Sequence, residues 1–520
     1  MKDKPHREKL IWLALALLVA AGGVVAVLYK TRYGPGASGD SVYYLMGARN
    51  LLSGNGFSRY SGGWEAIPIT GFPPFFSVLL AGIGLLGENL FAGARYLNAL
   101  LFGANIFLVS LMVFRYTRSV TAGVVSALLI LTSESMLLYH SWVMTEALFI
   151  FLMLCSLHAL VQYFETGGLA ALIFSALMMA AATLTRYVGL AIVGTAGLSI
   201  LVLNRSGFTK RVLHAFLLGL VSVLPFILWL YRNSLVSSSL VNRQVIFHLI
   251  SGEVVLGFIS EAVSWFSPRI LQLPRLFDAA LFLVGAIMIP AVFFSLEIRR
   301  GVLRRDVNWQ GGSILPWLLI LFIPTYILLL ILNTSLFDAS TSLAATRRYL
   351  LPVFTAVVVL MTCVVHRFVA VRVGWTPLKS LSLLAAVLLI GLNGLEAGRY
   401  LRDPNQDMGY TSIKRAWYQV VDQINEIDSS HLFISDNVEL FYFLADRPAY
   451  ALPISYDNYT QQARQDYDQQ VAATQERLDK GAVIVLFYPQ GDRSQVLARL
   501  DVVQLNEFPQ AVFYIKSSQN

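Results

Sequence analysis

Several charged residues beside the apolar runs of this chain have side chains suited to phosphate binding and proton transfer. Arginine can contact a phosphate through two hydrogen bonds of its planar guanidinium, and a carboxylate can accept the proton of a hydroxyl. An arginine cluster with a carboxylate beside lipid indicates transfer of a group from a lipid phosphate. The residues are Asp40 after the first apolar run, Glu146 in "HSWVMTEALF", Arg186 in "ATLTRYVGL", and Arg347 and Arg348 before "YLLP".

Each of these residues also has an ordinary structural alternative. An arginine at the end of a spanning helix commonly extends toward the lipid headgroups, and we prefer that interpretation for Arg95. A single aspartate after a helix is commonly a cap or a solvated loop residue. For Asp40, Glu146 and the Arg347–Arg348 pair, the joint pattern of carboxylates and guanidiniums on one membrane face favours a shared cavity.

The elements that must position these residues are membrane helices. The chain has 520 residues, of which 56% are hydrophobic and 13% charged, whereas a soluble domain carries about 25% charged residues. A spanning helix needs roughly 20 apolar residues. We predict about eleven spans, near residues 10–29, 91–114, 119–139, 144–164, 169–186, 188–204, 212–231, 276–296, 313–333, 350–369 and 379–396.

The basic loops predict the orientation of these spans. With a cytoplasmic N-terminus, the segments "RYTRS", "NRSGFTKR", "EIRRGVLRRD" and "HRFVAVRVGWTPLK" all fall on the cytoplasmic side, where short basic loops are enriched. The short apolar segment 73–87 would reverse that pattern if it crossed, so we predict that it stays at the outer interface. The first run, 10–28, is predicted to be a retained span, because it is too long for a signal peptide and lacks a cleavage site.

Two domains follow from this topology. Residues 1–396 form the membrane domain, with large outer loops at about 30–90 and 232–275. Residues 399–520 contain 11 Lys/Arg and 16 Asp/Glu, although the whole chain has a net charge of +8, so the basic excess belongs to the membrane part and indicates membrane lipids as partners rather than nucleic acid. We predict that residues 397–520 are a small extracytoplasmic α/β domain that covers or shapes an outer site.

Its apolar pattern predicts helices in "YTSIKRAWYQVVDQINEI", "DNVELFYFLAD" (capped by Asp436) and "YTQQARQDYDQQVAATQERLD", and strands in "HLFIS", "AVIVLFY" and "AVFYIK". The sequence contains no phosphate-binding GxxxxGK[ST] loop and no GxGxxG turn, so nothing in it indicates an ATP-driven or nicotinamide enzyme. Its two cysteines, Cys155 and Cys363, lie in apolar runs and are predicted to be buried hydrophobic residues.

Six short motifs, in this order, resemble those of the GT-C glycosyltransferases, in the branch that includes the protein O-mannosyltransferases and the lipid A aminoarabinose transferase. An acidic residue in the first outer loop precedes a Tyr…Ala-Arg-x-Leu pattern, here Asp40, Tyr43 or Tyr44, Ala48, Arg49 and Leu51. The others are "GFPPFFSVLLAGIGLLG", "ARYLNALLFG", "TEALFIFLMLC", "LTRYVGL" and "RRYLLP". The resemblance covers residues 10–400. Many relatives have Asp-Glu at the first acid, where this chain has Asp40-Ser41.

The resemblance implies a polytopic helical transferase in the inner (plasma) membrane that moves a sugar from a polyprenyl-phosphate donor to a glycan, lipid or protein acceptor on the outer face. Asp40 would be the general base of an inverting reaction, and Arg347, Arg348 or Arg186 would hold the departing phosphate. Glu146 would position the acceptor or a divalent ion, and metal dependence is left open. Aromatic residues and Arg49 of the first loop would contact the acceptor, namely Tyr43, Tyr44 and Trp64.

Two other functions remain open at this point. A transporter or lipid flippase of envelope precursors is the main alternative, although the spans carry few charges at mid-membrane and show no pair of matching broken helices. A non-catalytic assembly factor with the same fold is the second, and the presence of Asp40 argues against it. Tyr43 and Tyr44 could also belong to an interfacial aromatic belt.

Overall fold

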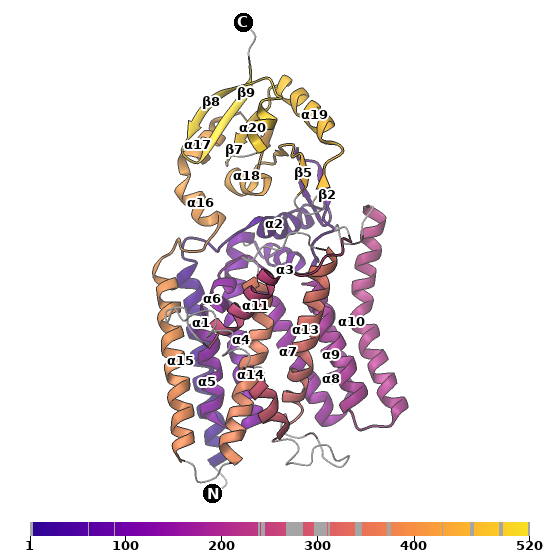
Figure 1. Ribbon diagram of the computed structural model, residues 1–520, viewed down its shortest axis with the longest axis vertical. Coiled ribbons are helices and arrows are strands. Elements are labelled where there is room, and N and C mark those ends of the chain that lie inside the picture. Colours follow the sequence, from indigo (N-terminus) through magenta and orange to yellow (C-terminus); the bar gives the residue numbers. More distant parts are fainter. Residues whose placement is uncertain are drawn as a thin grey trace.

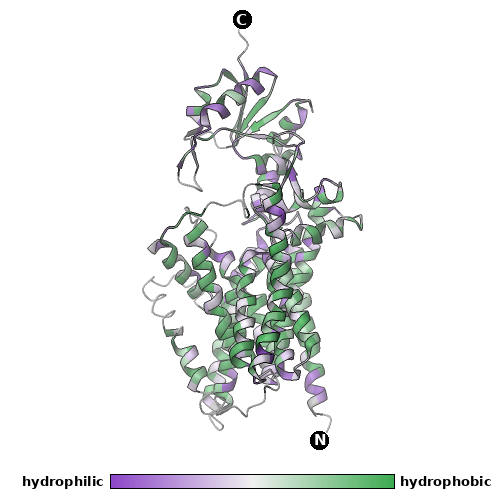
Figure 2. Ribbon diagram, turned by 90° about the vertical axis from the view of Figure 1, so that its right-hand side faces the viewer, coloured by the Kyte–Doolittle hydropathy of each residue, from purple (hydrophilic) through white to green (hydrophobic). Residues whose placement is uncertain are grey.

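The computed structural model describes residues 4–60, 62–87, 89–237, 240, 245–266, 284–285, 287–295, 309, 312–337, 346–371, 376–428, 430–457, 462–487 and 492–517. A long helical body carries a smaller domain at one end, and the N-terminus lies at the other end (Figure 1). Figure 2 shows mostly hydrophobic residues along the helices of the body and a mixture of hydrophobic and hydrophilic residues in the smaller domain.

Long apolar helices form the body. Among the described residues, seven helices are long and apolar enough to cross a membrane, and an eighth span results if α5 and α6, which meet at 63°, are counted together. Helix α4 lies centrally and packs against α1, α5 and α7. The helices are α1 (Lys4–Lys30), α4 (Leu90–Thr117), α5 (Val120–Leu131), α6 (Glu134–His140), α7 (Glu146–Thr166), α8 (Leu169–Thr183), α9 (Leu190–Leu203), α10 (Phe208–Val236), α13 (Leu315–Phe337), α14 (Thr346–Val371) and α15 (Thr376–Arg402).

The predicted spans agree well with these helices, and the chain is a multi-pass membrane protein. Ten of the eleven predicted spans each coincide with a helix or with the α5–α6 pair. Of the remaining span, 276–296, residues 284–285 and 287–295 are described and are helical, whereas the basic loop 297–306 lies outside the described residues. Helices α8 and α9 are shorter than the other spans, so the total of eleven stays a prediction.

The three described basic loops gather at the end of the body that carries the N-terminus (Figure 1). There the guanidinium of Arg367 in α14 donates to the hydroxyl of Tyr116 in α4 over 3.0 Å, and the indole of Trp309 donates to the carbonyl of Leu203 over 3.2 Å. The N-terminus and the C-terminal domain therefore lie at opposite ends, as an odd number of crossings requires. Which end faces the cytoplasm remains a prediction.

A layer of short elements lies between the body and the C-terminal domain (Figure 1). The predicted interfacial segment 73–87 contains α3, which is only 10 residues long and is therefore too short to cross. Helix α11 comes from the second predicted outer loop and packs against α14. The elements of this layer are α2 (Gly39–Leu52), β1 (Ser58–Tyr60), β2 (Ala66–Pro68) and α3 (Phe75–Gly84), whereas α11 (Gly252–Ser264) lies beside α14 in the body (Figure 1).

The C-terminal domain is α/β, as predicted, around a five-stranded sheet in the order β4-β3-β7-β9-β8. Strand β3 is parallel to β4 and β7, whereas β9 is antiparallel to β7 and β8. The elements are α16 (Tyr410–Ala416), α17 (Tyr418–Glu426), β3 (Phe433–Ser435), α18 (Val438–Ala445), β4 (Tyr450–Ala451), β5 (Tyr456–Asp457), β6 (Gln462–Ala463), α19 (Tyr467–Asp479), β7 (Val483–Leu486), α20 (Asp492–Leu497), β8 (Val502–Phe508) and β9 (Ala511–Lys516).

Three predicted helices of this domain differ from the structure. The helix predicted from residue 459 begins only at Tyr467, because residues 462–463 form strand β6. The predicted helix in "YTSIKRAWYQVVDQINEI" is divided at Trp417 into α16 and α17. The cap of α18 is Asn437, whose side chain accepts from the backbone N–H of Leu440 over 3.0 Å. Asp436 was the wrong choice because its carboxylate is used elsewhere, pairing with Arg493 over 2.9 Å and accepting from the N–H of Phe487 over 3.0 Å.

Candidate active site

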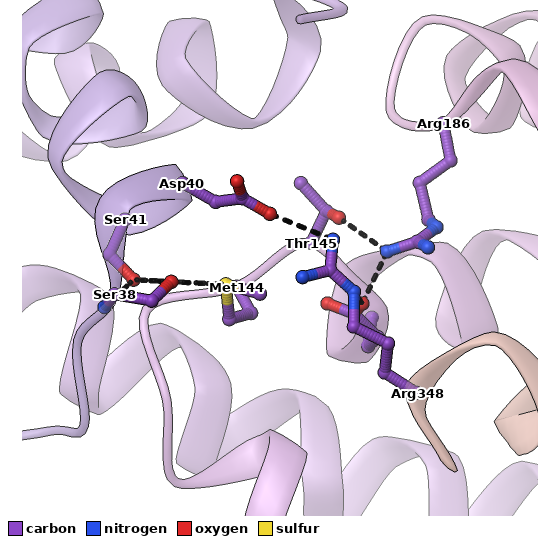
Figure 3. Close-up of polar contacts among 8 residues, drawn as sticks. Ser38, Asp40, Ser41, Met144, Thr145, Arg186 and Arg348 are labelled. Carbon is purple, nitrogen blue, oxygen red and sulfur yellow. Dashed lines mark hydrogen bonds and ion pairs between the residues drawn. The ribbon is translucent and has the colours of Figure 1, made fainter. Parts of the chain in front are cut away.

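Four of the predicted site residues meet at the end of the body that faces the C-terminal domain. Asp40 lies in the first turn of α2, Glu146 begins α7, Arg186 lies between α8 and the 3-10 helix Tyr187–Gly189, and Arg348 lies in the first turn of α14. Asp40, Arg186 and Arg348 point toward one another across this end (Figure 3). Segments separated by as many as 308 residues therefore contribute to one polar cluster.

Arg348 joins the two carboxylates of this cluster. Its Nη2 donates to Oδ2 of Asp40 over 2.8 Å, and its Nε lies 3.0 Å from Oε1 of Glu146. Arg186 pairs with the same Glu146 oxygen through Nη1, which also donates to the Thr145 hydroxyl over 3.1 Å. Two guanidiniums and two carboxylates thus balance in formal charge, and an arriving phosphate would find two arginines already oriented toward one point.

The residues of the cluster differ in accessibility. Glu146 is 2% exposed, whereas the side chain of Asp40 is 31% exposed and that of Arg348 is 20% exposed. Among the described residues, Oε2 of Glu146 has no hydrogen-bond partner. A buried polar atom without a partner is rare and calls for an explanation. Asp40 is the carboxylate that a substrate from the aqueous side reaches first, and Glu146 is the deeper one.

The start of α2 is fixed from both sides. The backbone N–H of Ser38 donates to the Ser41 hydroxyl over 3.0 Å, and that hydroxyl lies 3.7 Å from the sulfur of Met144 (Figure 3). Ser41 is fully buried, so a carboxylate in its place would lose its hydration without a described cation beside it. The serine at this position therefore fits its surroundings, and the site has one carboxylate on this turn.

Arg347 faces a different partner from its neighbour. Its Nε lies 3.4 Å from Oε2 of Glu261 in α11, and the Ser135 hydroxyl donates to the other oxygen of Glu261 over 3.3 Å. Burial raises the pKa of Glu261, and the charge of Arg347 opposes that shift. Of the two adjacent arginines, the structure places only Arg348 against Asp40 and Glu146.

The predicted acceptor residues separate into two groups. Tyr44 is 4% exposed, with edge contacts to Phe72 and Phe76, so its ring is packed inside the protein in this structure. Burial raises its pKa. Tyr43 and Trp64 remain accessible. Trp64 is 62% exposed and touches the ring of Tyr60, with 5.1 Å between ring centroids.

Tyr43 and Arg49 both contact helix α18. The Tyr43 hydroxyl donates to Oε1 of Glu439 over 2.9 Å. Arg49 donates to the Tyr442 hydroxyl over 2.6 Å and pairs with Asp446, and the hydrogen bond to Asp446 raises the pKa of Arg49. Arg49 therefore joins the two domains in this structure, a role that the sequence analysis did not predict.

Sequence reasoning also missed residues that complete the cluster. Tyr349 places its ring 5.7 Å from the guanidinium carbon of Arg186 and 5.4 Å from that of Arg348. Thr145 accepts from Arg186. Both lie next to a charged site residue in the sequence, and that position was the one feature of the sequence that could have identified them. Glu439 and Glu261 lie far away in the sequence, and no local pattern marks them.

A metal site is not assigned. Among the described residues, no three His, Cys, Asp or Glu side chains come together as metal ligands. The two carboxylates of the cluster are already paired with guanidiniums, whose positive charge opposes a cation at the same place.

Comparisons with known proteins agree with this architecture. ArnT from Cupriavidus metallidurans, bound to undecaprenyl phosphate, matches over 96% of this chain and 98% of its own with a TM-score of 0.60 at 14% identity. The archaeal oligosaccharyltransferase AglB from Archaeoglobus fulgidus, in complex with an inhibitory peptide and a dolichol phosphate, matches over 97% of this chain and 74% of its own, with a TM-score of 0.52 at 13% identity. Curated protein sequences include no match to this chain.

The family comparison covers the part of the chain in which the sequence motifs are densest. Residues 72–229 match the family described as dolichyl-phosphate-mannose-protein mannosyltransferase, and this segment contains Glu146, Arg186, the elements α3–α9 and most of α10. The predicted resemblance is thereby confirmed: the chain has the fold of the GT-C glycosyltransferases, and its residues 72–229 match the mannosyltransferase family model.

Proposed function

We propose that this chain is an integral membrane glycosyltransferase that transfers a sugar from a polyprenyl phosphate to the hydroxyl of a glycan, lipid or protein acceptor on the outer face of the membrane. The observation that carries the proposal is the cluster of Asp40, Glu146, Arg186 and Arg348 at one end of the helical body. The mannosyltransferase family match and the fold shared with two proteins solved with a polyprenyl phosphate support it.

The position of the cluster suits a lipid-linked donor. The polyprenyl tail stays in hydrocarbon, so its phosphate is held at headgroup depth, where α7 and α14 begin. Arg348 and Arg186 are the cations within reach there. As the bond between the anomeric carbon and the phosphate oxygen breaks, negative charge grows on the phosphate, and fixed guanidiniums stabilise that charge.

Asp40 is the proposed general base. The acceptor oxygen attacks the anomeric carbon from the side opposite the phosphate, Asp40 takes the hydroxyl proton, and the configuration inverts. Without substrate, Arg348 holds Asp40 over 2.8 Å. A bound phosphate competes for that guanidinium, so donor binding would release Asp40 for the acceptor. Glu146, the more deeply buried carboxylate, keeps both arginines in this orientation.

The test begins with identification of the donor. Lipid-linked sugars and envelope polymers are compared in cells with and without the gene, and the lipid that accumulates without it serves as the donor for the purified protein in nanodiscs. Asp40→Asn keeps the size of the side chain but cannot accept the proton. We expect transfer to fall by about 10²–10⁴-fold, the usual range for loss of a general base.

The matched control is Asp422→Asn in α17, an exposed aspartate of the C-terminal domain. Its transfer rate should equal that of the wild type. Near wild-type turnover in Asp40→Asn would refute Asp40 as the base. If no lipid-linked sugar accumulates and the purified protein consumes none, the glycosyltransferase assignment itself fails.

A further inference from the structure

A second polar site lies between the two domains, beside the cluster described above. It is a small cleft, partly open to solvent, lined on the membrane side by α2 and β1 and on the other side by α18 and the segment that follows it. Helices α2 and α18 are in contact along this boundary, and α18 lies directly over α2 (Figure 1).

The walls of the cleft carry one cation and one carboxylate. Arg59 in β1 lies over the ring of Tyr43, 5.4 Å from its centroid. Glu439 in α18 accepts from the Tyr43 hydroxyl through Oε1. Tyr43 therefore separates the two charged groups, and no ion pair joins them among the described residues. Arg59 is only partly exposed, and its guanidinium has no described carboxylate partner.

The floor of the cleft is apolar and aromatic. Val42 and Met46 of α2 pack against Tyr442 of α18, and Tyr60 joins this small cluster. Pro448 and Ala449 close the far side. Flat apolar rings beside hydrogen-bonding groups suit a carbohydrate, whose ring faces are apolar and whose edges carry hydroxyls. The guanidinium of Arg59, which has no described carboxylate partner, adds a preference for an anion. A planar guanidinium can donate two hydrogen bonds at once to a carboxylate or a phosphate.

We propose that this cleft binds the acceptor through an acidic carbohydrate unit, meaning a sugar that carries a carboxylate or a phosphate. Arg59 pairs with the anionic group, Oε2 of Glu439 accepts from a sugar hydroxyl, and the partly exposed ring of Tyr60 packs against the sugar. This assignment rests on the proposed function only in identifying the bound molecule as the acceptor. The binding of an acidic carbohydrate in the cleft does not depend on catalysis.

The cleft and the catalytic cluster share helix α2. Tyr43 lies one turn after Asp40, and side chains three residues apart project from the same side of a helix. An acceptor held at Tyr43 would therefore direct a neighbouring hydroxyl toward Asp40. The C-terminal domain supplies Glu439 and Tyr442, so the two domains together would form the acceptor site.

The experiment measures sugar binding to the full-length protein in nanodiscs, with no donor present. The probes are methyl glucuronide, glucosyl phosphate and methyl glucoside, which share a hexose ring and differ in charge. We expect at least one anionic probe to bind about tenfold or more tightly than methyl glucoside, as a charge-assisted contact allows. A carboxylate preference and a phosphate preference are distinguished by the first two probes.

Two variants test the assigned groups. Arg59→Gln removes the charge and should reduce the affinity for the anionic probe to that of methyl glucoside. Glu439→Gln should weaken all three probes. The control is Asp446→Asn, which weakens the Arg49–Asp446 pair between the same two helices but does not line the cleft, and it should bind as the wild type does.

The proposal is overturned by any of three results: no anionic probe binds the wild type better than methyl glucoside, Arg59→Gln keeps the anionic preference, or Asp446→Asn loses as much affinity as Arg59→Gln. The last result would mean that the variants only disturb domain docking. Because the assay contains no donor, these results do not affect the proposed transfer reaction, and failure of that reaction would not remove an observed anionic preference.

Discussion

Helix α7 carries one glutamate at its first residue, Glu146, and another, Glu165, one residue before its last. Glu165 uses both carboxylate oxygens: Oε2 pairs with Arg115, and Oε1 accepts from the backbone N–H of Gly312 over 2.6 Å. Glu146 binds Arg186 and Arg348 through Oε1 alone and leaves Oε2 without a partner among the described residues. The first contact is complete within the protein, whereas the second leaves a polar atom for a ligand.

The difference shows that a glutamate–arginine pair at a helix end does not by itself mark a functional site. At the N-terminal end of the body, the pair connects α4, α7 and the segment before α13. At the other end, the arginines are shared with Asp40, which is partly exposed. Saturation of hydrogen bonds, rather than residue type, separates the structural pair from the candidate site.

The largest expected effect contrasts the two glutamates. Glu146→Gln removes the charge that orients two arginines, so we expect sugar transfer to fall by about 10²-fold or more. Glu165→Gln should keep the transfer rate but weaken a mostly buried ion pair, which lowers the stability of the protein by about 1–3 kcal/mol. Turnover and thermal unfolding are measured for both variants in the same nanodiscs. Equal losses of turnover in the two variants would show that the two glutamates do not differ in function.

A smaller effect contrasts two adjacent arginines. Arg348→Gln should weaken binding of the free polyprenyl phosphate by about tenfold or more, because it removes a charge-assisted contact. Arg347→Gln should weaken it far less, since Arg347 pairs with Glu261 instead. Equilibrium binding of the lipid phosphate to both variants decides the question. The same loss in both would indicate that the two side chains exchange places when the donor binds.

The smallest effect concerns Glu261 and pH. Burial raises its pKa, so the folded state holds this proton more strongly than the unfolded chain, and the contribution of Glu261 to stability falls as pH rises through the mildly acidic range. Glu261→Gln removes that dependence. We expect the melting temperature of the variant, relative to wild type, to be higher at pH 7.5 than at pH 5, as measured by thermal unfolding. A relative melting temperature that is lower at pH 7.5 would show that the Arg347 pair outweighs burial.

Much of the helical body could be predicted from the sequence, because long apolar runs have few alternatives in a membrane. The same runs indicated which charged residues lie at which end, so Asp40, Glu146, Arg186, Arg347 and Arg348 could be grouped in advance. The C-terminal domain was predicted less completely. Strand β8 (Val502–Phe508) has a mixed pattern, with its residues mostly exposed, and it was not identified.

The local sequence pattern does not decide which of two adjacent side chains faces the site. Arg347 and Arg348 are separated by about 100° around their helix, and so are Tyr43 and Tyr44. The packing of α14 against α11 and α7 directs Arg347 to Glu261 and Arg348 to the cluster. The packing of α2 between α3 and α18 buries Tyr44 and turns Tyr43 toward Glu439.

The sequence by itself determined that this chain is a membrane protein and that its paired carboxylates and arginines gather at one end, since hydrophobicity and charge act at the level of whole segments. Only the tertiary structure decided which member of each adjacent pair reaches the site, and that Arg59 and Glu439, far apart in the chain, line the same cleft. The rotation of a helix and the docking of a domain depend on the sum of many contacts, which no single stretch of sequence contains.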